Sequence, residues 1–254
     1  MADITAIIIY RSDNDDFEKC IKSVHEITDV IVVLDPLKSD KARMICRDKE
    51  IDYQTSDAEK IGKDLRKTVE GMKPEYLLFL RSNEYLSGQL KNSLINQRQL
   101  LNNDAYRINI LKNYYGQWMK HSGLYPDYQV RLLKKQEAHQ VIPEIEKIAI
   151  SGETKTTGVI PGDLYSVIYK NIWEHIQIMN IVTERDAHML LDKGIKTNII
   201  KIVFHPLAQF LMLFFIKLGF LDGFYGMVNT VISGHTIFLT QVKLRELHRL
   251  NRSK

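Results

Sequence analysis

The stretch AIIIYRSDNDDFEKCIKSVHEITDVIVVLDPLKSDKA, residues 6–42, decides the fold class. It contains two unbroken apolar runs, at residues 6–10 and 30–34. Runs that are apolar throughout are typical of strands buried on both faces of a parallel sheet. Between them, Phe17, Ile21 and Val24 recur at helical spacing. A strand, a helix and a second strand in this order predict a right-handed βαβ unit.

The same alternation of strand and helix patterns continues downstream of this unit. Strands are predicted at residues 51–53, 76–80, 105–111 and 128–134, and helices at residues 39–48, 58–72 and 87–101. These elements predict an α/β fold with a mostly parallel, doubly wound sheet.

The second half of the chain has a different pattern. Residues 114–125 predict an aromatic, glycine-containing loop, and residues 143–162 are rich in loop signals. From Leu164 onward the pattern is helical, and it is strongly apolar over residues 199–239. We therefore expect a first domain over residues 1–163 and a helical C-terminal extension over residues 164–254.

Composition narrows the classes of function. The 254 residues are 44% hydrophobic and 26% charged, which excludes a disordered or fibrous chain. The net charge of +4 is small and its basic residues are dispersed, so we expect no nucleic-acid partner. Cys20 and Cys46 are too few for a disulfide framework or a zinc site. A cytoplasmic location, without a signal peptide, is expected.

The apolar C-terminal region has two interpretations. No stretch reaches about 20 uninterrupted apolar residues, so we expect no transmembrane helix. An apolar stripe is expected at Phe210, Leu213, Phe214, Lys217 and Leu218. In one interpretation, it belongs to a helix that is buried in the core or in an oligomer interface. In the other, it lies on anionic lipid. The tail adds the basic residues Lys243, Arg245, Arg249, Arg252 and Lys254. We favour a peripheral contact with the inner face of the cell membrane.

Polar residues follow several predicted strands, where α/β sheets bind ligands. Asp35 follows the second strand, and residues 81–84 (RSNE) follow the run at residues 76–80. The Asp35 carboxylate can accept hydrogen bonds from a ribose or an amide, or it can simply begin an Asp-Pro turn. As a strand-end residue it is expected to lie outside the core.

Four segments resemble, in the right order, the family 2 glycosyltransferases of the GT-A type, and especially the lipopolysaccharide-core and cell-envelope members. Residues 6–42 are similar to the family's nucleotide-binding start, with Asp35, Ser39 and Asp40 on its pattern. YLLFLRSNEYLS, residues 76–87, stands where the family carries Asp-x-Asp-Glu. GQWMKHSGLYPDYQVRLLKK (residues 116–135) and GFLDGFYGM (residues 219–227) resemble two segments of the lipopolysaccharide-core subgroup.

The resemblance implies transfer of a sugar from a nucleotide-sugar donor to a lipopolysaccharide-core or other envelope glycan, free or lipid-linked, with inversion. It implies that the donor is bound by the positions that match the family, which are Asp35, Asp40, Arg66, Arg81, Asn83, Glu84, His121 and Arg131. Arg66 is equally consistent with a solvated helix face. The candidate general base is Glu144, with Asp127 as the second candidate.

One departure from the family separates two hypotheses. The Asp-x-Asp carboxylates bind a divalent cation, magnesium or manganese, but here the triplet is Arg81-Ser82-Asn83. In the first hypothesis, Arg81 replaces the cation at the donor diphosphate, with Asn83 as a weak metal ligand at most. In the second, the chain is a non-catalytic nucleotide-sugar-binding or interaction subunit, and Arg81 merely pairs with Glu84 at the surface. Retention of the segments around His121 and residues 219–227 favours an enzyme, because they have no evident folding role.

Overall fold

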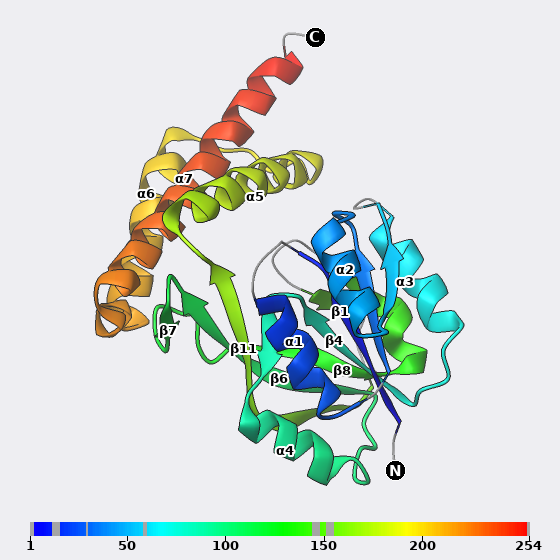
Figure 1. The fold of residues 1–254 in the computed structure, drawn as a ribbon. Coiled ribbons are helices and arrows are strands. Elements are labelled where there is room, and N and C mark those ends of the chain that lie inside the picture. Colours follow the sequence, from blue (N-terminus) through cyan, green and yellow to red (C-terminus); the bar gives the residue numbers. More distant parts are fainter. Residues whose placement is uncertain are drawn as a thin grey trace. The chain divides into compact units, whose positions relative to one another are not determined.

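The computed structural model describes residues 3–11, 16–28, 30–57, 60–143, 148–150 and 155–252 (Figure 1). The chain forms two compact units. Unit 1 comprises Met1–Leu111 and Asp127–Val167, and unit 2 comprises Lys112–Pro126 and Ile168–Lys254. The last crossing of the chain between the units falls between Val167 and Ile168. The segment Lys112–Pro126, which the sequence placed in the first domain, is part of unit 2.

The first four strands form the parallel part of the sheet. They are β1 (Ile4–Ile9), β2 (Ile31–Asp35), β3 (Asp52–Thr55) and β4 (Tyr76–Arg81). β1 pairs in parallel with β2 and β4, and β2 pairs in parallel with β3. All residues of β1, β2 and β4 are buried, as their apolar runs predict.

The later strands are antiparallel. They are β5 (Glu84–Leu86), β6 (Ala105–Tyr114), β7 (Gln117–Met119), β8 (Tyr128–Lys134) and β11 (Thr157–Tyr169). Among the described residues the sheet order is β3-β2-β1-β4-β8-β6-β11-β5, with β7 beside β6. A separate hairpin joins β9 (Val141–Pro143) to β10 (Ile148–Ile150). The predicted α/β class is confirmed, and its parallel pairing is confined to β1–β4.

Helices cover both faces of the parallel part. α1 (Asp16–His25), α2 (Asp40–Asp48) and α4 (Gly88–Gln97) share one core with Ile4, Ala6 and Ile8. α3 (Ile61–Glu70) and the 3₁₀ helix η1 (Lys135–Gln140) share the other with Ile7 and Ile9. Successive residues of a strand point to opposite faces, so β1 supplies both cores.

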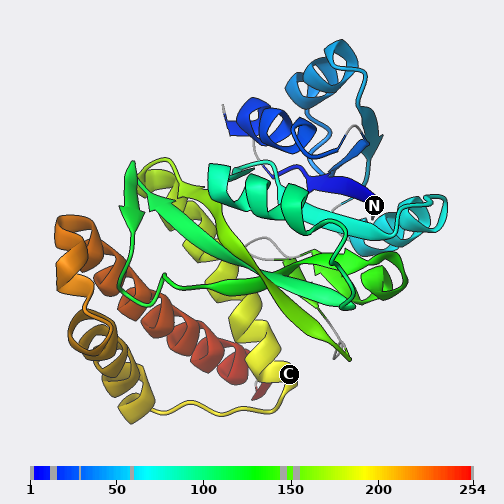
Figure 2. The same ribbon diagram turned by 90° about the horizontal axis from the view of Figure 1, so that it is seen from below.

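Unit 2 is mostly helical, and its helices are α5 (Ile172–Asp192), α6 (Ile199–Leu211), the π-helical η2 (Met212–Ile216), the 3₁₀ η3 (Gly219–Asp222) and α7 (Gly223–Arg252). α7 packs against both α5 and α6 (Figure 2). The predicted helix from Leu164 is wrong, because β11 continues to Tyr169. The sequence predicted a loop at Pro161 and Gly162, but both residues lie in β11. Gly162 has a φ of 108° and lies close to the backbone of Leu90, which a glycine permits.

Candidate functional site

A buried ion-pair cluster occupies the position of the altered triplet. Arg81 ends β4, Glu84 begins β5, and Arg131 lies in β8, which is beside β4 in the sheet. Arg81 Nε and Nη2 donate to Glu84 Oε1 at 2.9 and 2.6 Å, and Arg131 Nη2 donates to the same oxygen at 2.8 Å. The Arg81 backbone N–H donates to Oε2 at 2.8 Å. Glu84 therefore joins two cations that the sequence separates by 50 positions.

The cluster is ionised and carries a net positive charge. Glu84 and Arg131 are both 0% exposed, and Arg81 is 3% exposed. Burial raises the pKa of the Glu84 carboxyl, but Arg131 and Arg81 outweigh burial and hold this pKa below its ordinary value. Burial lowers the pKa of Arg131 to about 10, which leaves its guanidinium charged at neutral pH. One carboxylate thus faces two guanidinium groups.

The described residues do not fit a divalent cation at this position. Asn83 Nδ2 donates to the Val167 carbonyl at 2.5 Å, which leaves only Asn83 Oδ1 without a partner. A magnesium or manganese ion prefers several oxygen ligands with negative charge. The negative charge of the neighbouring Glu84 is already compensated by its ion pairs with two arginines. Among the residues that the structure describes, no group of three His, Cys, Asp or Glu side chains could hold a metal. Asn83 as a metal ligand is therefore unsupported.

Several buried polar atoms around Glu84 have no partner. They are Arg131 Nε and Nη1, Asn83 Oδ1 and the Ser166 hydroxyl. Ser166 of β11 stands opposite Glu84 of β5 in the strand register. The Arg131 nitrogens and the Ser166 hydroxyl are hydrogen-bond donors, and guanidinium groups bind phosphate oxygens well. All of these atoms are buried, so an anionic ligand reaches them only if the packing around the cluster opens.

Asp35 lies inside the fold, and the expectation that it lies outside the core is wrong: it is 0% exposed. Its Oδ1 accepts from the backbone N–H groups of Leu37 and Lys38 at 2.7 and 3.0 Å. Its Oδ2 accepts from the Ser39 N–H and the Tyr53 hydroxyl, both at 2.7 Å. A carboxylate offers about four lone-pair sites, and all four of these sites on Asp35 accept hydrogen bonds within the protein. The carboxylate therefore stabilises the loop between β2 and α2.

We expect Asp35→Ala to lower the free energy of unfolding by about 2–3 kcal/mol, because three loop N–H groups and a tyrosine hydroxyl lose a charged acceptor. Asp40→Ala is the matched control, since the Asp40 side chain is 92% exposed and should change stability by less than about 0.5 kcal/mol. Urea denaturation followed by circular dichroism measures both. Equal stability of the two variants would show that Asp35 has no structural role.

The structure places the other predicted residues of unit 1 as follows. Asp40 lies 3.8 Å from Arg43 on the surface of α2, and Arg66 is exposed on α3. Asp127 is half-buried, accepts from Gln129 Nε2 at 2.8 Å, and favours the charged form of Arg131. Asp127 therefore belongs to the surroundings of the arginine cluster. Glu144 lies outside the described residues.

In unit 2, the structure brings together the two segments that most resemble the lipopolysaccharide-core subgroup. The buried Asp222 carboxylate accepts from the backbone N–H groups of Lys120 and His121 at 3.1 and 2.9 Å. It also contacts His121 Nδ1 at 3.0 Å and accepts from the Ser122 hydroxyl at 3.3 Å. These bonds join positions about 100 residues apart.

Both segments therefore have a folding role, contrary to the sequence interpretation. An added Cβ at Gly226 would lie 2.0 Å from the Gly219 carbonyl oxygen, and one at Gly219 would lie 2.9 Å from Ser122 Oγ. This packing explains why both segments match the family pattern. The match is therefore no evidence for catalysis. Asp222 is a residue that sequence reasoning missed, although it stands within the quoted signature. A donor contact by His121 remains a prediction.

An aromatic cluster around His175 was not predicted from the sequence. The hydroxyls of Tyr114 and Tyr115 each lie 2.8 Å from His175 Nδ1, and the Tyr169 ring stacks on the imidazole at 3.8 Å. Burial lowers the pKa of His175 to about 4, so this histidine is neutral at physiological pH. The cluster fixes the start of α5 against β6 and β11 within unit 2.

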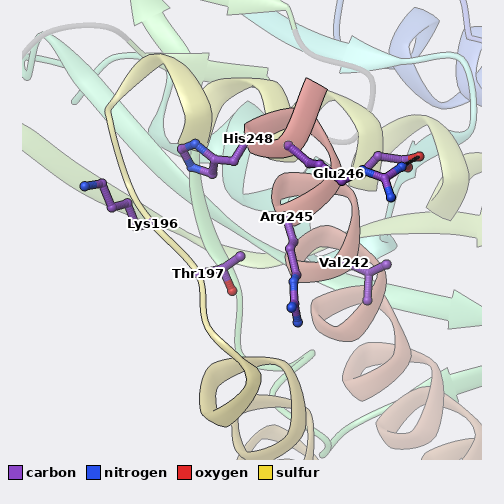
Figure 3. A pocket seen from close by; sticks show the side chains of 7 residues that line it. Lys196, Thr197, Val242, Arg245, Glu246 and His248 are labelled. Carbon is purple, nitrogen blue, oxygen red and sulfur yellow. Dashed lines mark ion pairs between the residues drawn. The ribbon is translucent and has the colours of Figure 1, made fainter. Parts of the chain in front are cut away.

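A pocket of about 620 Å³ lies elsewhere in unit 2, between the loop before α6 and the end of α7 (Figure 3). Its lining includes the basic residues Lys196, Arg245 and Arg249 together with Glu246. None of the predicted site residues lines it. It is therefore a basic surface of unit 2 and not the predicted donor site.

No family profile matches the chain. Among solved structures, the chain is similar to S. aureus TarS 1-349 in complex with UDP-GlcNAc, at 10% identity and a TM-score of 0.49, covering 98% of this chain and 92% of that one. It is also similar to a 4-diphosphocytidyl-2C-methyl-D-erythritol synthase, at 14% identity and a TM-score of 0.44, covering 64% and 91%. The chain spans 39% of a longer TarS structure. Similarity at this level assigns neither activity nor substrate.

Proposed function

We propose that the protein is a nucleotide-sugar-dependent glycosyltransferase of the GT-A type. It would act at the cytoplasmic face of the membrane on a lipopolysaccharide-core or other envelope glycan. The observation that carries the proposal is the pair of buried arginines, Arg81 and Arg131, beside the carboxyl end of β4. Parallel strands bind ligands at this edge, and the resemblance predicts a diphosphate there. Positive charge is what a departing diphosphate needs.

The proposed reaction is a single displacement. The acceptor hydroxyl oxygen bonds to the anomeric carbon while the bond from that carbon to the donor diphosphate breaks, and the nucleoside diphosphate leaves with the electron pair. Arg81 and Arg131 would neutralise the charge that develops on the diphosphate, with phosphate oxygens competing with Glu84 for their N–H groups. Glu144 or Asp127 would accept the hydroxyl proton.

A second function is favoured by a specific observation. Glu84 already binds both arginines in the buried cluster, and this closed arrangement suits a non-catalytic relative that keeps the fold but transfers no sugar. Such a protein would bind a nucleotide sugar or a partner without turnover. The two functions differ in what Arg81 does to donor binding and in whether product forms.

The experiment measures binding and transfer for a panel of nucleotide sugars, with added magnesium or manganese and with EDTA. We expect both to survive EDTA, because arginines replace the cation. Arg81→Ala should weaken diphosphate-containing ligands by about 10–100-fold, since a hydrogen bond to a charged group contributes about 1.5–3 kcal/mol, while the bare nucleoside binds unchanged. Turnover only with a metal would refute the arginine role. Binding without transfer in any condition would establish the non-catalytic alternative.

A further inference from the structure

One helical segment of unit 2 leaves a long apolar face exposed. Ile199–Ile216, which comprises α6 and η2, is long and apolar enough to cross a membrane, yet only 11% of it is buried. The apolar face consists of Ile200, Phe204, Leu207, Leu211 and Phe215, which are each 45–63% exposed. Their spacing of three or four residues places them on one side of the helix. Soluble proteins rarely expose contiguous apolar surface of this extent.

The predicted apolar stripe is a different side of the same segment. Leu213 is buried, and Phe210 and Phe214 are half-buried and stack on each other at 5.5 Å. Ile202 is buried as well, and the Pro206 carbonyl lies close to Gly234 of α7. Ile202, Phe210 and Leu213 thus lie on the side that packs toward α7, whereas Lys217 and Leu218 of the predicted stripe are exposed. The apolar face points away from α7.

Contacts at both ends hold this segment in place within unit 2. At its start, the Thr197 hydroxyl donates to Gln241 Oε1 of α7 at 2.6 Å. At its end, the Ser122 N–H donates to the Lys217 carbonyl at 2.9 Å, beside the bonds of Asp222. α5 packs on the same α7 and carries Glu184, Arg185 and Asp186, which are costly inside a bilayer. If the segment crossed a membrane, it would lose these contacts with Gln241 and Ser122 and its packing on α7.

The charges around the apolar face are complementary to an anionic surface. Residues 193–243 contain five lysines, at positions 193, 196, 201, 217 and 243, and Lys243 is paired with Glu184 of α5 at 3.1 Å. Asp222 is their single acidic residue, and it is buried and hydrogen-bonded. Lys201 and Lys217 stand near the two ends of the segment. A second copy of this segment would bring Lys201 and Lys217 together with no carboxylate on residues 199–216 to pair them, so lipid is the occupant that fits.

We propose that α6 and η2 lie in the plane of an anionic membrane, with the apolar face buried in one leaflet at the boundary between headgroups and acyl chains. Lys201 and Lys217 would reach the headgroups through their aliphatic stems. This proposal rests on the membrane location in the proposed function, and it adds the surface and its orientation. Phe220, Leu221 and Phe224, which are exposed where the segment turns into α7, would extend the contact.

Flotation with vesicles tests the surface. The full-length protein should float with vesicles that contain phosphatidylglycerol and much less with pure phosphatidylcholine, and high salt should weaken its binding. Phe204→Ser/Leu207→Ser/Leu211→Ser should reduce the partition coefficient at least about tenfold, because three apolar side chains no longer leave water. The matched control, Met44→Ser/Ile95→Ser/Leu100→Ser, changes exposed apolar residues of unit 1 and should bind like the wild type. Equal loss in both variants would overturn the proposal.

Spin labels test the orientation. Cys20 and Cys46 are buried, so single cysteines at Ile200, Leu207 and Phe215 can be labelled selectively. Equal depths at all three positions on vesicles would support the in-plane arrangement, whereas a maximum at position 207 would mean that the segment spans the bilayer. Failure to bind vesicles, with dimerisation that the triple variant abolishes, would identify a second copy as the occupant. Either of these two results overturns the proposal.

The tests of vesicle binding and of nucleotide-sugar binding can fail independently of each other. The triple variant should still bind nucleotide sugars, because the apolar face belongs to unit 2 and the arginine cluster to unit 1. Nucleotide-sugar binding without vesicle binding would refute this inference alone. Vesicle binding without any nucleotide-sugar binding would refute the proposed function alone.

Discussion

Glu84→Ala is expected to lower the free energy of unfolding by about 3–5 kcal/mol, the largest effect of any single substitution considered for this protein. The carboxylate is fully buried and is the acceptor for both Arg81 and Arg131. Its removal leaves two buried guanidinium groups of like charge without the carboxylate that joins them. Chemical denaturation measures the effect, with the exposed Glu70→Ala as the control.

A triple variant separates the ion-pair cluster from simple packing. Arg81→Met/Glu84→Leu/Arg131→Met removes all three charges together, so it should be more stable than Glu84→Ala, because no unpaired charge remains inside the protein. If the triple variant is the less stable of the two, the explanation by uncompensated charge is wrong.

The same cluster has a predicted pH dependence. The folded state lowers the pKa of Glu84 below its ordinary value of 4.5. Its contribution to stability is therefore complete above about pH 4.5 and is lost as the pH falls through the lower folded-state value. Stability of the wild type should fall more steeply in this acidic range than that of Glu84→Gln.

Asp222→Ala is expected to destabilise unit 2 by about 3 kcal/mol, because one buried carboxylate holds the backbone of Lys120 and His121 and the hydroxyl of Ser122. Loosening of this loop also frees the turn after η2, since Ser122 N–H donates to the Lys217 carbonyl. Hydrogen exchange at residues 120–123 and 217–222 should accelerate together. The exposed Asp192→Ala, at the end of α5, is the control and should leave both regions protected.

A double-mutant cycle with His121→Ala isolates the His–Asp contact from the backbone bonds. If Asp222 acts mainly through the backbone N–H groups, the coupling energy will be a small part of the total loss. If Asp222→Ala and Asp192→Ala have the same stability, Asp222 does not anchor the loop.

The sequence alone predicted much of the first half of the fold. The apolar runs gave the positions of β1, β2 and β4, and β8 matches its predicted range of residues 128–134. Ser39 and Ser87, the residues at which helices were expected to begin, cap α2 and α4 through their side chains. These features follow from periodicity and capping, which depend on residues within one helical turn or one strand of each other.

The candidate site could be predicted only in part. The altered triplet at Arg81 and Asn83 was visible in the sequence, but the partnership of Glu84 with Arg131 was not, since the two residues are 47 positions apart. The Asp222 contacts span about 100 positions. The bond between Asp35 and the Tyr53 hydroxyl was missed as well, because these residues lie 18 positions apart on neighbouring strands.

What the sequence by itself determined is therefore the set of local elements and the residues that depart from the family pattern. Only the tertiary structure decided which charges meet, that the retained segments hold unit 2 together, and which side of α6 is left exposed. The physical reason is that periodicity records whether a side chain faces apolar surroundings, but not which distant group it faces. That choice follows from the order of strands in the sheet and the packing of α6 on α7.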